Sequence, residues 1–282
     1  MKAGFHISIQ GSIDTSADRA AELGCTTFQI FTRNPRQWNS AKITPQTAKV
    51  FSDKLKNYGI EPVFAHMPYL PNLASSKEEV YNKSVETLTS ELERCIQLEI
   101  PYLVTHMGSH LGNGIEIGFT RLINGVNRAL KDTEDSVMLL LENTAGTRNS
   151  MGSTFEDIQH VIEHLIDQER VGICFDTSHA FAAGYDLRTK ETIQSTITKI
   201  EKVVGFERVK LVHLNDSKGD LNSRIDRHQH IGMGKIGEEG FRNLLASKFG
   251  EIPLIMETPK DEIRDDVGNL KKLKEISGWG VI

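Results

Sequence analysis

Strand-like and helix-like segments alternate along the whole sequence, and this alternation limits the possible folds more than any other feature. Short runs of apolar and β-branched residues recur eight times, as expected for parallel strands that are covered on both faces. We predict strands at Ala3–Ile9, Thr27–Phe31, Pro62–Ala65, Tyr102–His106, Val137–Glu142, Val171–Asp176, Val209–His213 and Pro253–Glu257.

Amphipathic patterns between these runs predict helices. Thr44 and Pro45 are typical of a helix start, apolar residues then recur every three or four positions, and Gly59 is typical of a helix end. A later helix is predicted to begin with a capping box formed by Ser153 and Glu156.

Eight strands that are each followed by a helix predict an α/β protein with a single (β/α)₈ barrel, one domain over residues 1–282. An open, doubly wound sheet is the competing arrangement. The GxGxxG motif that often follows the first strand of such a sheet does not occur here. No linker rich in proline, serine or glycine divides the chain, which favours one domain.

The composition limits the class of protein further. The formal net charge is −5, which argues against a nucleic-acid partner unless bound cations change the balance; three divalent ions would reverse its sign. The three cysteines lack CxxC spacing and are interpreted as buried or incidental thiols in a reducing compartment. We see no signal peptide and no membrane-spanning run, and therefore expect a cytoplasmic protein.

Six consecutive predicted strands carry a side chain that can bind a metal at or just beyond their C-terminal end. These side chains are His66, His106, Glu142, Asp176, His213 and Glu257. A single such residue would more simply cap a turn. Six together predict an active site, because the strands of a barrel deliver their last residues to one face. Clustered carboxylates also need a counter-charge, which a metal supplies.

Three further candidate ligands lie in loops: His179, Asp226 and His228. The set of nitrogen and oxygen ligands without cysteine suits zinc, with manganese or iron as alternatives, and nine residues are more than one tetrahedral ion can use. We therefore expect more than one ion and a multinuclear metal-dependent hydrolase. For His6 in the first strand, a core position and a functional position both remain open, as does a supporting role for His110 and His230.

Five long motifs resemble the endonuclease IV family, the apurinic/apyrimidinic-site endonucleases of base excision repair. They are FTRNPRQW (31–38), LLENTAG (140–146), FDTSHAFAAGYD (175–186), HLNDSK (213–218) and SRIDRHQHIGMGKIG (223–237). The resemblance covers nearly the whole chain, and all nine metal positions of that family are filled here.

The resemblance implies three zinc ions, with manganese possible at some sites. One is held by His66 and His106, with Glu142 bridging to a second held by Asp176, His213 and Glu257, and the third is held by His179, Asp226 and His228. It implies catalytic roles for Glu142 and Glu257. It also implies hydrolysis by a metal-bound hydroxide of the phosphodiester 5′ to an abasic site, leaving a 3′-hydroxyl, and removal of 3′-blocking groups.

The expected partner is duplex DNA with abasic sites, bound by a monomer. RNPRQW places Arg33, Arg36 and Trp38 together, suited to phosphate contact and stacking. The resemblance implies that Arg36 and Tyr69 enter the duplex while the abasic nucleotide is flipped into the pocket. Lys235 and the backbone amides of IGMGKIG are candidates for contacting a phosphate. From the residues alone, a surface loop around a core tryptophan is the simpler interpretation of RNPRQW.

Two alternatives remain. The first is a metal-dependent sugar isomerase or epimerase on the same barrel, which would not need the third set of His179, Asp226 and His228. The second is a DNA-damage-binding protein without catalytic activity, which would have no use for nine metal ligands.

Overall fold

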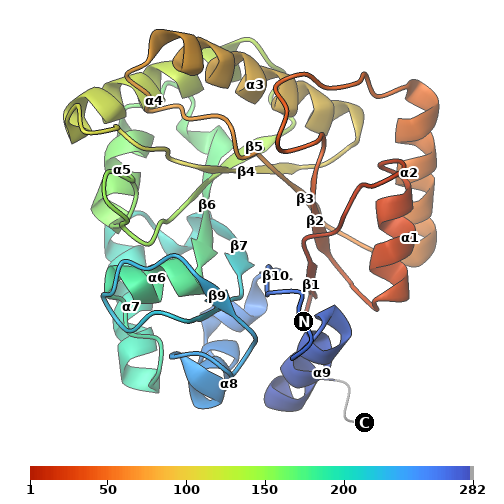
Figure 1. Cartoon of the computed structure of the whole chain (residues 1–282), viewed down its shortest axis with the longest axis vertical. Coiled ribbons are helices and arrows are strands. Elements are labelled where there is room, and N and C mark those ends of the chain that lie inside the picture. Colours follow the sequence, from red (N-terminus) through yellow and green to blue (C-terminus); the bar gives the residue numbers. More distant parts are fainter. Residues whose placement is uncertain (280–282) are drawn as a thin grey trace.

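A computed structural model, which describes residues 1–279, shows eight parallel strands arranged as a nearly closed barrel with helices outside it (Figure 1). Around the sheet the strands follow the order β1, β10, β7, β6, β5, β4, β3, β2. Their bounds are β1 Ala3–Phe5, β2 Phe28–Phe31, β3 Val63–His66, β4 Tyr102–His106, β5 Met138–Glu142, β6 Val171–Asp176, β7 Val209–His213 and β10 Leu254–Met256. The predicted fold class is confirmed, and the predicted strands lie where the apolar runs placed them.

The barrel closes between β1 and β2 at a narrow seam. The two strands meet at one parallel bridge between His6 and Gln29, where the N–H of Ile7 donates to the carbonyl of Gln29 at 2.7 Å. Gly4 permits this approach, because a Cβ at that position would lie 1.7 Å from the carbonyl oxygen of Thr27. The seam therefore brings the side chains of His6 and Gln29 together toward the C-terminal ends of the strands.

The helices surround the strands (Figure 1). They are α1 Thr15–Glu22, α2 Pro45–Tyr58, α3 Glu78–Gln97, α4 Ile115–Lys131, α5 Phe155–Glu163, α6 Thr177–Ala183, α7 Lys190–Val203, α8 Gly237–Leu245 and α9 Asp266–Ser277, with short 3₁₀ turns η1 Gln168–Arg170, η2 Phe206–Arg208 and η3 Lys248–Glu251. None of the helices described is both long and apolar enough to cross a membrane.

The predicted ends of α2 are confirmed, whereas the predicted start of α5 is wrong by one residue. The hydroxyl of Thr44 accepts the N–H of Thr47, and Gly59 ends α2 in the left-handed conformation with φ 65°. In α5 the N-cap is Thr154, whose hydroxyl accepts the N–H of Asp157. The predicted box of Ser153 and Glu156 does not form, because Thr154 is the extended residue from which a hydroxyl can reach the first turn.

The apolar core has two parts. One lies between the sheet and the helices, and the other fills the inside of the barrel with one buried side chain from each of six strands: Phe64, Val104, Leu140, Cys174, Leu211 and Ile255. This inner layer fills the barrel beneath the C-terminal ends of the strands, so that a site at those ends lies above a packed core. The cysteines are buried and free, and burial raises the pKa of the Cys25 and Cys174 thiols to about 12.

One element was not predicted. After β7 the chain forms a small antiparallel pair, β8 Asp216–Ser217 with β9 His228–Gln229. This pairing restrains the long loop between β7 and α8, and it fixes the position of His228 over the barrel.

Candidate metal centre

The strand ends bring their polar side chains to one face of the barrel. His66, His106, Glu142, Asp176 and His213 are the last residues of β3 to β7, and Glu257 follows β10 directly. A cavity of about 380 Å³ opens above the inner core, and its lining includes His66, His106, Glu142, His179, Asp226, His228 and Glu257. Asp176 and His213 lie fully buried beneath it.

Glu142 lies at the centre of this cluster. Its Oε2 is 3.1 Å from Nε2 of His66 and 3.6 Å from Nε2 of His106, whereas its Oε1 is 3.2 Å from Nδ1 of His213. The two oxygens of one buried carboxylate thus face two different groups of ligands. This is the arrangement that a carboxylate shared between two cations requires.

Three overlapping groups of side chains could each hold a metal ion, with their ligand atoms within 4.8 Å of one another. The groups are His66, His106 and Glu142; Glu142, Asp176 and His213; and Asp176, His179 and His228. The two remaining predicted ligands lie beside them: Oε2 of Glu257 is 3.5 Å from Nδ1 of His213, and Oδ1 of Asp226 is 3.1 Å from Nε2 of His179. The structure therefore brings all nine predicted ligands into one cluster.

The hydrogen bonds of the histidine rings test whether this cluster suits cations. Three rings have Nδ1 beside a main-chain carbonyl oxygen that can only accept: His66 with Met67 at 2.7 Å, His179 with Asn143 at 3.0 Å and His228 with Glu257 at 3.1 Å. In its neutral form each ring therefore carries its proton on Nδ1 and has the lone pair of Nε2 available for a ligand. Nε2 of His228 is buried and has no hydrogen-bond partner within residues 1–279. The donor set thus fits metal ions.

The charges in the cluster also favour cations. Burial alone would lower the pKa of His179, but the carboxylates of Asp176, Asp226 and Glu142 raise it well above its ordinary value. Burial would raise the pKa of Glu142, yet His106 and His213 hold it well below its usual range. The pKa values of Asp226 and Glu257 are lowered as well, by contacts with His179 and with His213 and His6. These carboxylates therefore stay ionised in or beside a buried space, where positive charge must compensate them.

Arg36 and Tyr69, the two residues predicted to enter DNA, lie on neighbouring loops. Arg36 is exposed on the loop after β2, and Tyr69 is 67% exposed on the loop after β3. The N–H of Tyr69 donates to the carbonyl of Pro35 at 3.1 Å, and the Tyr69 ring packs edge-on against Phe31 with 5.0 Å between centroids. Tyr69 also lines the cavity, so both loops border the candidate site.

Arg33 does not fit the predicted DNA contact. It is buried, its guanidinium pairs with the fully buried Glu91, and it donates to Ser90 Oγ at 2.9 Å and to the carbonyl of Trp38 at 3.1 Å. These bonds hold the loop after β2 against α3 and leave the guanidinium no exposed face for a phosphate. Trp38 is half-buried in the same loop, with Nζ of Lys83 5.9 Å from its ring centroid.

The loop IGMGKIG differs from the prediction in a similar way. The N–H groups of Gly234, Ile236 and Gly237 donate to the carboxylate of Asp216 at 2.8, 3.0 and 3.3 Å. The protein's own carboxylate therefore occupies the amides that were predicted to contact a phosphate. Lys235 stays exposed, with Nζ 3.3 Å from Asp220.

Sequence reasoning missed the amide side chains that orient the candidate ligands. Asn215 donates to Asp176 Oδ2 at 2.8 Å and accepts the N–H of Glu257 at 2.8 Å, and Asn143 pairs with both main-chain groups of Asp176. Gln29 contacts His213 and Glu257 from β2. The available signal was a polar residue inside or just after an apolar strand, as in TTFQIF, LLENT and VHLND.

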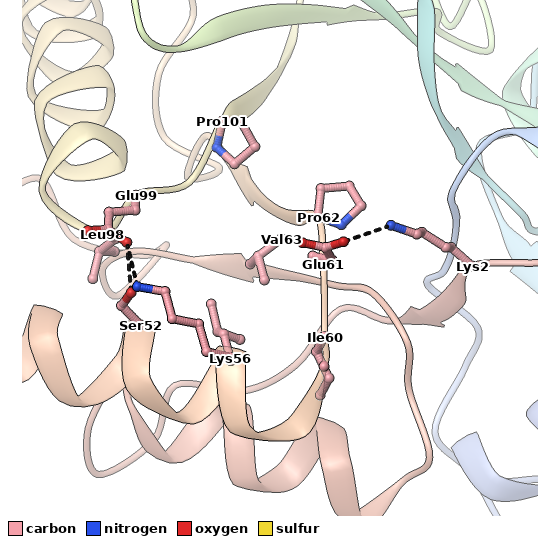
Figure 2. Close-up of a pocket in the computed structure, with 12 residues that line it drawn as sticks. Lys2, Ser52, Lys56, Ile60, Glu61, Pro62, Val63, Leu98, Glu99 and Pro101 are labelled. Atoms are coloured by element: carbon pink, nitrogen blue, oxygen red, sulfur yellow. Dashed lines mark hydrogen bonds and ion pairs between the residues drawn. The ribbon is translucent and has the colours of Figure 1, made fainter.

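A larger cavity, about 680 Å³, lies at the opposite end of the barrel and shows no comparable chemistry (Figure 2). Residues that precede β1, β3 and β4 line it, and its charged groups neutralise one another. Lys2 lies 3.7 Å from Glu61, and Glu99 accepts from Ser52 at 2.7 Å and pairs with Lys56 at 3.8 Å. None of the candidate metal groups found within residues 1–279 borders it. The smaller cavity is therefore the candidate site.

Known proteins resemble the chain over almost its whole length. The family described as "Xylose isomerase-like TIM barrel" matches residues 17–276. "Probable endonuclease 4" of Methanoculleus marisnigri is 52% identical and that of Nitrosopumilus maritimus is 50% identical; the alignments cover 98% of this chain and 98% and 100% of those proteins. The crystal structure of endonuclease IV from Thermus thermophilus superposes with a TM-score of 0.87 at 34% identity, covering 98% of both chains.

Proposed function

The chain belongs to the endonuclease IV family of xylose isomerase-like TIM barrels, and we propose that it is a metal-dependent DNA repair endonuclease. Its substrate is duplex DNA with an abasic site, in which it cuts the phosphodiester 5′ to the lesion and leaves a 3′-hydroxyl. It also removes groups that block 3′ ends. The observation that carries this proposal is the gathering of Glu142 and the eight other candidate ligands in one cluster, in or directly beneath one cavity.

The ligand set suits three zinc ions, with manganese possible at some sites. His66 and His106 would hold one, with Glu142 shared between it and a second held by Asp176, His213 and Glu257, while His179, Asp226 and His228 would hold the third. Ions held by these ligands would stabilise the negative charge on phosphate oxygens and would make water a nucleophile near neutral pH.

The chain's own residues supply the shape and the fixed charges of the site. Glu142 directs its two oxygens to opposite sides, and Glu257 places Oε2 3.5 Å from Nδ1 of His213. We assign catalytic roles to these two carboxylates because both border the cavity in which the phosphodiester would lie. A cavity of about 380 Å³ suits one extruded sugar–phosphate unit, so the abasic nucleotide must leave the helix to enter it.

The loops after β2 and β3 would engage the duplex itself. The side chains of Arg36 and Tyr69 are both exposed, Tyr69 lines the cavity, and the hydrogen bond from the N–H of Tyr69 to the carbonyl of Pro35 joins the two loops. We propose that these two side chains occupy the space left by the extruded nucleotide. We assign weaker contacts with the DNA backbone to Trp38, in the loop after β2, and to Lys235, in the loop between β9 and α8.

The position of the third ligand group argues against a sugar isomerase. Nε2 of His179 is 3.1 Å from Oδ1 of Asp226, and Nε2 of His228 is 4.0 Å from the same oxygen. A further cation at this position is useful where charge develops on several phosphate oxygens, and it has no evident role in moving a proton or hydride along a sugar. The complete cluster also lies within one chain, which supports a monomer as the active form.

The deciding experiment combines metal analysis with cleavage of a duplex that carries a single abasic site. The metal-replete protein should hold about three ions per chain and cut only the damaged strand, and a polymerase should extend the new end. Matched controls are an undamaged duplex, the chelated protein, and Lys56→Ala at the opposite cavity, which should cleave normally. Bound metal together with cleavage of neither abasic nor 3′-blocked DNA would refute the proposal.

A further inference from the structure

We propose that Gln29 is a positioning residue of the metal centre, because its amide fixes the ring nitrogen that His213 offers to a cation and holds Glu257 beside it. This inference rests on the metal-dependent function proposed above. It concerns a residue on β2 that is not one of the nine candidate ligands.

Gln29 is fully buried at the seam where β1 and β2 meet. Its side chain makes three hydrogen bonds, one through the amide oxygen and two through the amide nitrogen. Oε1 is 2.9 Å from Nε2 of His213, and Nε2 of Gln29 is 2.8 Å from Oε1 of Glu257 and 2.9 Å from Nδ1 of His6. Two of the three partners, His213 and Glu257, are candidate ligands of the same ion.

These contacts determine the orientation of the amide. If its oxygen and nitrogen were exchanged, an oxygen would face the carboxylate of Glu257 at 2.8 Å, and both groups can only accept. The amide nitrogen must therefore face Glu257, and the oxygen must face His213.

The orientation of the amide in turn fixes the tautomer of His213. Because the amide oxygen can only accept, Nε2 of His213 must carry a proton, and in the neutral ring that binds a cation the lone pair therefore lies on Nδ1. Nδ1 is the nitrogen that faces the cluster, 3.2 Å from Oε1 of Glu142 and 3.5 Å from Oε2 of Glu257. Gln29 thus gives His213 the opposite tautomer from that of His66, His179 and His228, whose Nδ1 atoms face main-chain carbonyls.

Glu257 is held through the same amide. Its Oε1 accepts from Gln29, which leaves Oε2 on the side of His213, and its main-chain N–H donates to Asn215 at 2.8 Å. A carboxylate fixed at one oxygen and at its backbone presents the other oxygen in a single direction. The side chain is therefore ordered before a cation binds, and binding costs less conformational entropy.

His6 completes the network through its Nδ1. Its Nδ1 accepts a hydrogen from Gln29 at 2.9 Å, a shorter contact than the 3.3 Å to Glu257. Of the two positions left open for His6, the structure favours one that supports the metal centre.

The test compares the metal affinity of Gln29→Leu and Gln29→Glu with that of the parent. Leu removes both the oxygen that accepts from His213 and the N–H that donates to Glu257. Glu can still accept from His213, but it places an oxygen next to the carboxylate of Glu257. We expect one ion to bind about ten- to hundred-fold more weakly in both variants, measured by competition with a chromogenic chelator. Cobalt-substituted protein should show an altered absorption band for that ion. Asn243→Leu is the matched control, because it removes a buried amide that donates to the carbonyl of Arg188 at 3.2 Å and lies outside the lining of the cavity.

The outcomes separate this inference from the proposed function. If either Gln29 variant binds every ion with the affinity of the parent, Gln29 does not position the centre, whatever the parent cleaves. If the variants lose affinity as expected while the parent cuts no abasic DNA, the positioning role stands and the proposed activity fails. Should Gln29→Leu not fold, Gln29→Glu still decides the question, because it keeps the size of the buried side chain and the oxygen that accepts from His213.

Discussion

His228 is oriented by Glu257, because the carbonyl oxygen of Glu257 accepts from Nδ1 of His228 at 3.1 Å. One candidate ligand therefore fixes the ring of another through its backbone, while its side chain faces His213. Nε2 of His228 is left with its lone pair 3.7 Å from Oδ2 of Asp176. The ligand groups are thus linked, and variants must be tested for metal content as well as for rate.

Replacing Glu142 with Gln should abolish most cleavage. The variant keeps the size of the side chain but removes the negative charge that faces His66 on one side and His213 on the other. We expect the single-turnover rate on abasic duplex to fall by about 100-fold or more, while some affinity for that duplex remains. A rate near that of the parent would show that no shared carboxylate is needed.

Removing the metals should destabilise the fold. Glu142 and Asp176 are almost completely buried, and without cations their charges lack full compensation. Since ligands that bind only the native state stabilise it, chelation should lower Tm by about 10 °C, and added zinc should restore it. Differential scanning calorimetry with metal analysis of both samples tests this. An unchanged Tm in protein shown to be metal-free would contradict it.

Arg33→Met should affect stability, not recognition of damage. The substitution leaves the carboxylate of Glu91 buried without its closest partner. Breaking such a pair costs about 3–5 kcal/mol, which urea unfolding would detect. The folded fraction should still prefer abasic over undamaged duplex. A selective loss of this preference at unchanged stability would return Arg33 to the DNA contacts.

Replacing both Arg36 and Tyr69 with Ala should have the opposite result. Both side chains are exposed, so metal content and Tm should change little. Affinity for abasic duplex should fall by about ten-fold or more, because contacts that stabilise the opened helix are lost. Equilibrium binding to abasic and undamaged duplexes provides the measurement. If the double variant discriminates as well as the parent, these loops do not probe the helix.

The barrel and the gathering of the six ligands at its strand ends followed from the sequence because both depend on strand periodicity. A strand that ends at His106 or Glu142 delivers that side chain to the C-terminal face wherever the chain forms a parallel barrel. Such patterns depend on the identity and spacing of residues, and the sequence shows both.

The supporting contacts could not be predicted, because they join residues far apart in the chain. Arg33 looked available for DNA, and its burial depends on Glu91 from α3. The amides of IGMGKIG looked free until Asp216 was found among them, and β8 with β9 depends on a pairing of only two residues on each side. Gln29 is polar within an apolar strand, which marks it as unusual without indicating its partners.

His179→Ala tests the class of enzyme. His179 lies at the start of α6, where the carboxylate of Asp176 accepts its N–H at 2.8 Å, and this backbone bond should survive the substitution. The variant should therefore fold, but it should lose one ion because Asp226 and His228 remain as an incomplete group. Incision of abasic duplex should fall by about 100-fold or more, since a cation near the phosphate oxygens is lost. Metal analysis and single-turnover kinetics on the same sample measure both effects, and neither parent nor variant should isomerise or epimerise free sugars. Activity of the parent on a monosaccharide with none on abasic DNA would instead assign the chain to the sugar isomerases.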